Sequence, residues 1–182
     1  MADVVPRVIT RSVGVADART RGVVFIHGAP RALCPHIEWA LAADLGTRVL
    51  LDWTPQPVVG GQVRAEFSWT GAPGTAARVV SSLRTWGQLR LEVTEEPSLG
   101  AEGERYALTP SLGVFRATIG VHGDVLVNEE RLRGALARAA AGDSDLTSEL
   151  SGLLGTPWDI ELEPFRFAGD ATSVRWLHQV VS

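Results

Sequence analysis

Residues that could act as a nucleophile, a base or a ligand gather in one short stretch of the sequence. His27, Arg31, Cys34, His36 and Glu38 lie close together, and Cys34 directly precedes a predicted helix. A thiol at a helix N-terminus is favoured as a thiolate, because the helix dipole stabilises negative charge there. With imidazoles nearby, this group could supply a nucleophile and a base, or three ligands for a soft metal.

The same residues also have a structural interpretation, which we favour. Cys34 is the only cysteine of the chain, and a lone cysteine is most often a small buried hydrophobic residue. Cys-Pro-His is not the spacing of a known metal or protease site, and the sequence contains neither Cys-x-x-Cys nor His-Glu-x-x-His. We therefore predict no metal site and no cofactor, and keep Cys34, His36 and His27 only as alternative catalytic residues.

Arg31 offers a different chemistry at the same place. Its guanidinium and the free N–H groups of the following helix could converge on an anion. The alternative is that Arg31 pairs with a nearby carboxylate and only fixes the loop. Arg31, Cys34 and His36 are accordingly the hypothetical ligand-binding residues of the chain.

A second group of titratable residues is acidic. Its members are Glu92, Glu95, Glu96, Glu102 and Glu104. Carboxylates that lie in pairs can do acid–base chemistry or hold a cation. The spacing matches no known cation-binding loop, so we predict a solvated acidic loop here.

The elements that must position these residues follow a β-α-β-β-α-β order. Apolar runs predict strands over 22–27, 48–54, 62–69 and 89–94, and helical spacing predicts helices over 35–45 and 76–86. This order predicts an α+β fold with a ferredoxin-like βαββαβ half. We expect an antiparallel sheet in the order 4-1-3-2, with both helices on one face.

Strand alternation divides that sheet into an apolar and a polar face. Arg64, Glu66, Arg90 and Glu92 fall on the face that should point away from the two helices. If the C-terminal half packs there, it should meet them with polar or paired groups, because an unpaired buried charge is costly. This face lacks the aromatic residues with which an RNA-binding sheet stacks bases.

The second half of the chain predicts further elements. They are a linker over 97–104, a hairpin over 105–109 and 113–120, a helix capped by Asn128 and ended by Gly142, and a helix that starts at Ser144 or Asp145. Residues 156–167 are predicted to be extended and irregular, and 174–181 to be a short strand or a helical turn. We expect an N-terminal extension over 1–20, a first unit over 21–96 and a second over 97–182 that packs on it. Trp158 and Trp176 are predicted interface residues, because tryptophan is enriched in binding hot spots.

Composition excludes several classes of protein. The 182 residues are 45% hydrophobic and carry a net charge of -4, and every basic residue is arginine. Binding to nucleic acid is therefore disfavoured. One cysteine cannot form an internal disulfide, and no stretch reaches the roughly 18 apolar residues of a membrane span. The N-terminus does not have the pattern of a signal peptide, so we predict a cytoplasmic protein.

Several runs of the sequence resemble a known family. They are RGVVFIHGAPRALCPHIEWAL, LDWTPQP, GDVLVNEERLRGAL, ELEPFRFAG and VRWLHQVV. Together they resemble an actinobacterial family of uncharacterised proteins, known only as a domain of unknown function, and APRALCPHIEW is the most specific segment. The resemblance covers nearly everything after Thr20 and implies a bacterial intracellular protein, but no activity.

These observations favour a non-catalytic binding or assembly protein whose partner is an unknown protein or a second copy of the chain. The first alternative is a small enzyme or metal protein that uses Cys34 and His36. The second is a sensor of a small anionic molecule bound at Arg31.

Overall fold

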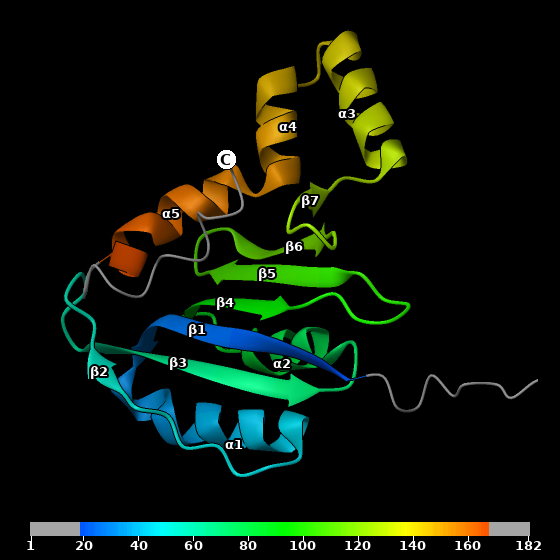
Figure 1. Ribbon diagram of the computed structural model, residues 1–182. Coiled ribbons are helices and arrows are strands. Elements are labelled where there is room, and N and C mark those ends of the chain that lie inside the picture. The colour runs from blue at the N-terminus through cyan, green and yellow to red at the C-terminus, as the bar shows by residue number, and fades with distance from the viewer. Residues whose placement is uncertain (1–18, 168–182) are drawn as a thin grey trace, which may run out of the picture.

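The computed structural model describes residues 19–167. They form an α+β fold in which seven strands make one antiparallel sheet, in the order β2-β3-β1-β4-β5-β6-β7 (Figure 1). The strands are β1 (Thr20–Pro30), β2 (Thr54–Pro55), β3 (Gln62–Gly71), β4 (Arg90–Glu95), β5 (Gly103–Thr109), β6 (Gly113–Ile119) and β7 (Val125–Leu126). The helices are α1 (Cys34–Leu45), α2 (Thr75–Leu83), α3 (Glu129–Ala141), α4 (Leu146–Leu154) and α5 (Thr156–Phe167), and a 3-10 turn at Arg31–Leu33 precedes α1.

The first four strands adopt the order that the sequence predicts. β1 lies between β3 and β4 and is antiparallel to both, and β2 pairs with the outer side of β3. The sheet then continues without interruption across residue 96, because β4 pairs with β5 over five residue pairs. The two units of the chain therefore share one sheet.

Helices α1 and α2 cover one face of the sheet, as predicted. Ile37 and Leu41 of α1 and Val79 of α2 are fully buried against Val24 and Leu91 of the strands. Gly46 ends α1 in the left-handed conformation, with a φ of 66°, as its position in the sequence predicts. Burial of this apolar layer supplies the main stabilisation of the fold.

Helix α5 covers part of the opposite face. Leu162 of α5 is fully buried against Phe115 and Ala117 of β6, and Ala107 of β5 completes this second apolar cluster. The helix contacts β5 and also reaches β1 near the middle of the sheet (Figure 1).

The prediction of extended structure over residues 156–167 is wrong, because this segment is α5. Two prolines suggested a break, but Pro157 stands in the first turn, where its missing N–H costs no hydrogen bond. Pro164 lies inside the helix. Trp158, Leu162 and Phe165 recur at helical spacing and pack against the sheet. This packing outweighs the low helix propensity of Pro164.

The predicted strand over residues 48–54 is also wrong in extent. Only Thr54 and Pro55 pair with β3. The side chain of Glu38 on α1 accepts hydrogen bonds from the Leu51 backbone N–H at 3.0 Å and from Nε1 of Trp53 at 2.9 Å. The segment before Thr54 is thus held by the Glu38 side chain of α1, and it does not form backbone hydrogen bonds to β3.

Helices α3 and α4 form a hairpin that projects beyond the β7 edge of the sheet (Figure 1). We call this hairpin the arm. Asn128 caps α3 by accepting from the Glu130 N–H, and Asp145 caps α4 by accepting from the Ser148 N–H. Gly142 and Gly155 end the two helices with φ values of 79° and 85°. The predicted starts and the predicted stop at Gly142 are therefore confirmed.

We expect Leu162→Ala to lower the free energy of unfolding by about 2–5 kcal/mol, because it leaves a cavity between α5 and the sheet. Ile160→Ala on the same helix is the control. Ile160 is 70% exposed, and its truncation should change stability by less than about 0.5 kcal/mol. Urea unfolding followed by circular dichroism measures both. Equal effects of the two substitutions would contradict the packing of α5 described above.

Candidate functional site

The loop that the sequence singles out is mostly exposed. Arg31 begins the 3-10 turn and faces solvent, Cys34 begins α1 and is half-buried, and His36 is exposed against the ring of Trp86, with 6.5 Å between ring centroids. The structure thus keeps Arg31, Cys34 and His36 near one another at the start of α1.

His27 does not join this group. It belongs to β1, and its side chain is buried on the face of the sheet opposite α1, beside α5. Glu38 is likewise committed elsewhere, since its carboxylate holds the segment of Leu51 and Trp53. Two of the five residues in the predicted constellation therefore have other partners.

Cys34 is in a poor environment for a nucleophile. Burial raises the pKa of its thiol, and the negative charge of Glu38 raises it further, against a smaller opposing effect of Arg31. The thiolate, which is the reactive form, is therefore less populated than in a free thiol. Within residues 19–167, no group of three His, Cys, Asp or Glu side chains could hold a metal ion.

The most densely bonded polar group is the carboxylate of Glu92, which is only 1% exposed. Oε2 lies 2.8 Å from Nε2 of His27, and Oε1 accepts a hydrogen bond from Arg105 at 2.9 Å. Arg166 near the end of α5 binds both oxygens, with Nε at 2.9 Å from Oε2 and Nη2 at 2.7 Å from Oε1. This is the two-pronged geometry in which arginine binds carboxylates most strongly.

Asp159 of α5 completes this network. Its Oδ1 accepts from Arg105 and from Arg166, the latter at 2.7 Å. We call His27, Glu92, Arg105, Asp159 and Arg166 the Glu92 cluster. Burial alone would raise the pKa of Glu92, but the hydrogen bonds from His27 and Arg166 and the positive charge of Arg166 hold it far below its usual value.

The prediction of a solvated acidic loop is therefore wrong for its two most buried members. Glu92 forms the cluster, and Glu95 accepts hydrogen bonds from the backbone N–H groups of Gly74, at 2.6 Å, and Ala76, at 2.9 Å, at the start of α2. A carboxylate at this position satisfies free N–H groups and the helix dipole together. Of the other three, Glu96 pairs with Arg21, Glu104 with Arg116, and Glu102 is exposed.

The polar face behaves as the strand alternation predicts. The C-terminal half does pack on it, and it brings charged partners: Arg166 reaches Glu92, and Glu161 lies 3.8 Å from Nε of Arg90. The guanidinium of Arg90 also stacks over Phe165, at 4.6 Å from the ring centroid. Sequence reasoning could not show that Glu92 is the acid buried in an ion network, because its partner Arg166 lies 74 residues later in the chain.

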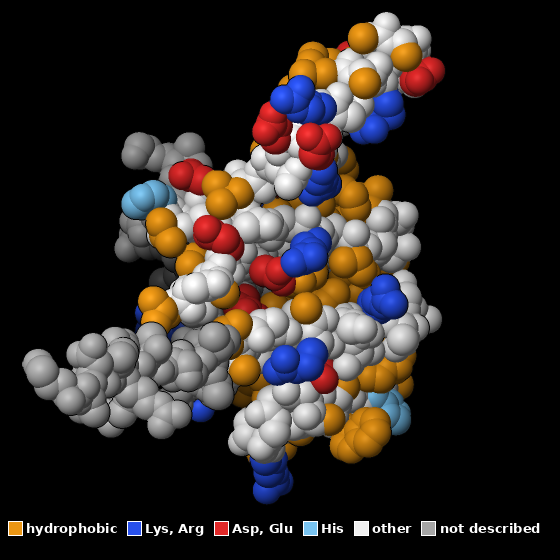
Figure 2. Space-filling view, turned by 90° about the vertical axis from the view of Figure 1, so that its right-hand side faces the viewer, with side chains coloured by type: hydrophobic (Ala, Val, Ile, Leu, Met, Phe, Trp, Pro, Cys, Tyr) orange, Lys and Arg blue, Asp and Glu red, His pale blue; other side chains and the backbone are white. Residues whose placement is uncertain are grey.

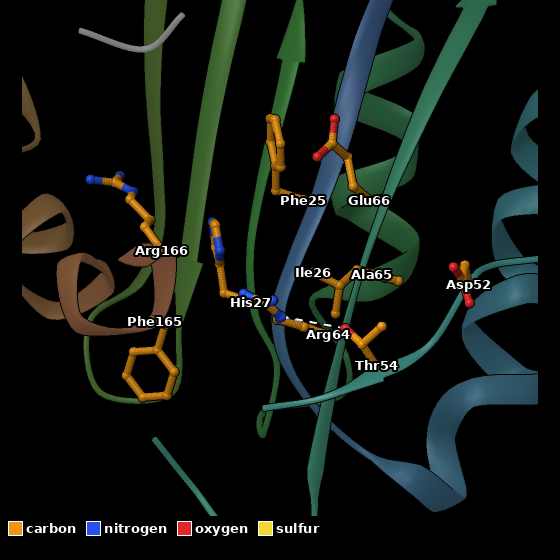
Figure 3. Close-up of a pocket in the computed structure, with 10 residues that line it drawn as sticks. All are labelled: Phe25, Ile26, His27, Asp52, Thr54, Arg64, Ala65, Glu66, Phe165 and Arg166. Atoms are coloured by element: carbon orange, nitrogen blue, oxygen red, sulfur yellow. Dashed lines mark hydrogen bonds between the residues drawn. The ribbon is translucent and has the colours of Figure 1, made fainter. Parts of the chain in front are cut away.

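A pocket of about 190 Å³ adjoins the Glu92 cluster (Figure 3). It lies where β1 and β3 meet the end of α5. It is lined by Phe25, Ile26, His27, Asp52, Thr54, Arg64, Ala65, Glu66, Phe165 and Arg166. Apart from His27, none of these residues belongs to the predicted sites.

The arm carries a second unusual surface. Five leucines are 36–55% exposed, and we call them the arm leucines: Leu132, Leu136, Leu146, Leu150 and Leu154. Figure 2 shows hydrophobic side chains on the projecting arm. Contiguous exposed apolar surface marks interaction sites in proteins.

Of the two predicted interface tryptophans, Trp158 lies within the described residues and Trp176 lies outside them. Trp158 packs against the ring of Phe115, and its Nε1 donates to the Gly113 carbonyl at 3.0 Å. It fastens α5 to β6.

Fold and cluster together define an α+β protein whose antiparallel sheet is covered by two helices on one face and joined through a buried ion network to a third helix on the other. In residues 19–167, no helix is long and apolar enough to cross a membrane.

The chain belongs to the family described as Protein of unknown function (DUF3145), whose sequence model matches residues 23–179. The expected membership of a family of unknown function is thus confirmed, whereas the APRALCPHIEW motif and the actinobacterial distribution stay predictions. No curated protein and no solved structure matches the chain.

Replacement of the buried carboxylate should be strongly destabilising. We expect Glu92→Gln to lower the free energy of unfolding by about 3–5 kcal/mol, because it leaves Arg105 and Arg166 without their central counter-charge. The pKa of Glu92 is lower in the folded protein than its unfolded value of about 4.3. Its stabilisation is therefore complete above that pH and declines as the pH falls below it.

Urea unfolding at pH 7 and at a series of lower pH values measures this contribution, with the exposed Glu102→Gln as the control. The wild type should lose stability over the acidic range, and the Glu92→Gln variant should lose less. The same acid dependence in both would contradict the assignment of Glu92 as the paired group.

We expect the Cys34 thiol to react with iodoacetamide at pH 7 more slowly than free cysteine, because its pKa is raised. The reaction should accelerate as the pH rises, and unfolding in urea should remove the difference. A rate above that of free cysteine at pH 7 would instead indicate an activated thiol.

Proposed function

We propose that this chain is a non-catalytic assembly protein that forms a two-fold symmetric dimer through the arm. The observation that carries the proposal is the exposure of the five arm leucines on two helices that project from the sheet. Each apolar Å² removed from water contributes about 25 cal/mol, so a partner that covers these side chains gains directly from burial.

The spacing of the arm leucines suits helix packing. Leu146, Leu150 and Leu154 recur every four residues and so form one stripe along α4, and Leu132 and Leu136 do the same on α3. Within the arm, Ala135 of α3 and Leu153 of α4 are buried, and Arg138 of α3 pairs with Glu149 of α4. The arm leucines are partly buried already, and a partner would cover the fraction of each side chain that is still exposed, which is largest for Leu136 at 55% and Leu154 at 49%.

The charges of α3 favour a second copy of the chain as the occupant. The helix begins with Glu129 and Glu130, which pair with Arg133 on the same helix, and its other basic residues are Arg131 and Arg138. If two copies of α3 pack antiparallel, the acidic start of each helix lies beside the basic part of the other. A two-fold axis makes the two contacts identical. A surface of mixed sign also offers no basic patch for a phosphate backbone or an anionic membrane.

The base of the arm extends the apolar surface toward the sheet. Leu126 of β7 is 46% exposed, and Val114 of β6 and Leu112, which precedes β6, are also exposed. A dimer of standard size buries about 800 Å² on each partner, which the arm alone need not supply.

Two features of the fold and of the Cys34 loop support this choice. We propose that β1 to β4 with α1 and α2 form a ferredoxin-like unit, a class whose members often associate through sheets or helices; this is an analogy between folds. The alternative of a Cys34 enzyme or metal protein is disfavoured by the raised pKa of the thiol. Arg31 is exposed, and an anionic ligand there stays a prediction.

Sedimentation velocity tests the proposal. The protomer mass is 19.5 kDa, and we expect the wild type to sediment at twice that mass at micromolar concentration. Leu136→Glu and Leu150→Glu should each shift the equilibrium to the monomer by at least roughly tenfold, because each places a charge in an apolar contact.

Leu50→Glu is the matched control, since Leu50 is exposed but belongs to the segment after α1. It should leave the dimer intact, and circular dichroism should show that all variants are folded. A wild type that remains monomeric at the highest concentrations, or a dimer that Leu136→Glu and Leu150→Glu leave unchanged, would overturn the proposal.

A further inference from the structure

Helix α5 covers only part of the second face of the sheet, and this leaves a pocket. The apolar residues that meet α5 come from β5 and β6, whereas the pocket is lined from β1 by Phe25 and His27 and from β3 by Arg64 and Glu66. Figure 3 shows these side chains on the open side of the two strands, with Phe165 and Arg166 of α5 beside them.

The cations that line the pocket have partners within the protein. Arg166 donates two hydrogen bonds to the Glu92 carboxylate and one each to Asp159 and Glu163. Arg64 donates to Thr54 and has a further interaction. An anionic ligand would have to displace internal carboxylates to reach Arg166. The pocket is therefore poorly suited to an anion.

His27 contributes an acceptor to this pocket. Its Nε2 faces Oε2 of Glu92 at 2.8 Å, and a carboxylate only accepts, so Nε2 carries the proton. The two carboxylates of the cluster, Glu92 and Asp159, are matched in charge by the two guanidinium groups of Arg105 and Arg166. In that tautomer Nδ1 is an acceptor, and no hydrogen bond reaches it from any residue in 19–167.

Glu66 contributes a charged acceptor. Its side chain lies on the same open side of the sheet as His27 (Figure 3), and among residues 19–167 it makes neither a hydrogen bond nor an ion pair. Partial removal of the carboxylate from water raises the pKa of Glu66, and the nearby His27 opposes this effect only in part. Asp52 at the pocket wall adds a second negative charge.

We propose that this pocket binds a small organic cation, whose ammonium or amidinium group donates to the Glu66 carboxylate and to Nδ1 of His27. The cationic group supplies the donors that both acceptors lack. The volume of about 190 Å³ equals roughly six water molecules, so the ligand is an amine or amidine with a body no larger than one small ring. This binding site is separate from the arm and does not depend on dimer formation.

Three probes of one size and different charge test the proposal by isothermal titration calorimetry at pH 7. They are benzylamine, benzyl alcohol and benzoate. We expect benzylamine to bind to the full-length protein, and benzyl alcohol and benzoate to bind at least roughly tenfold more weakly, because only the amine offers a charge-assisted hydrogen bond to Glu66.

Glu66→Gln should weaken benzylamine binding by at least roughly tenfold without changing the fold, because Glu66 is exposed enough to tolerate the amide. The control Glu102→Gln removes one negative charge from an exposed residue outside the pocket and should leave binding unchanged. Imidazole ¹⁵N shifts provide a second readout, since benzylamine should perturb Nδ1 of His27 and not the ring of His36. Stronger binding of benzoate than of benzylamine, no binding of benzylamine at millimolar concentration, or equal binding to wild type and Glu66→Gln would each overturn the proposal.

Discussion

The buried carboxylate of Glu92 is the constraint on which the arrangement of the second sheet face depends. A charge in a protein interior is tolerated only when donors surround it, and Glu92 receives them from β1, β5 and α5 through His27, Arg105 and Arg166. Apolar contacts are not directional, so Leu162 alone would allow α5 to slide over β5 and β6. The two-pronged contact of Arg166 fixes its position, because both nitrogens must face the same carboxylate.

Fixing α5 determines where the two proposed binding surfaces lie. The end of α5 stops beside β1 and β3, which leaves the pocket of Glu66 and His27 open. The start of α5 follows the arm through Gly155, whose φ is 85° and where a side chain would come within 2.5 Å of the Phe115 ring. Only glycine fits this junction, so the arm leaves the sheet at a direction that packing defines.

Elements with local signals could be predicted from the sequence, and those that depend on distant partners could not. The α3 and α4 starts were predictable because Asn128 and Asp145 act on N–H groups two or three residues away. Residues 48–54 have the composition of a strand, but Glu38, which lies earlier in the chain, captures their backbone. Strand alternation placed Glu92 on the polar face, yet its burial depends on Arg166, 74 residues later. Glu66 looked like an ordinary exposed residue, since only the incomplete cover of α5 makes a pocket around it.

The position of α5 also determines how the two surfaces relate to each other. A helix of twelve residues spans about 18 Å, so α5 separates the arm junction from the pocket by most of its length. A signal between them would require α5 to have two stable positions, because coupling needs an element with alternative states. The Glu92 cluster opposes this, since a shifted α5 would leave a buried carboxylate or guanidinium unpaired. The structure therefore favours two independent surfaces held by one rigid helix, and occupation of the pocket has no physical route to change the arm.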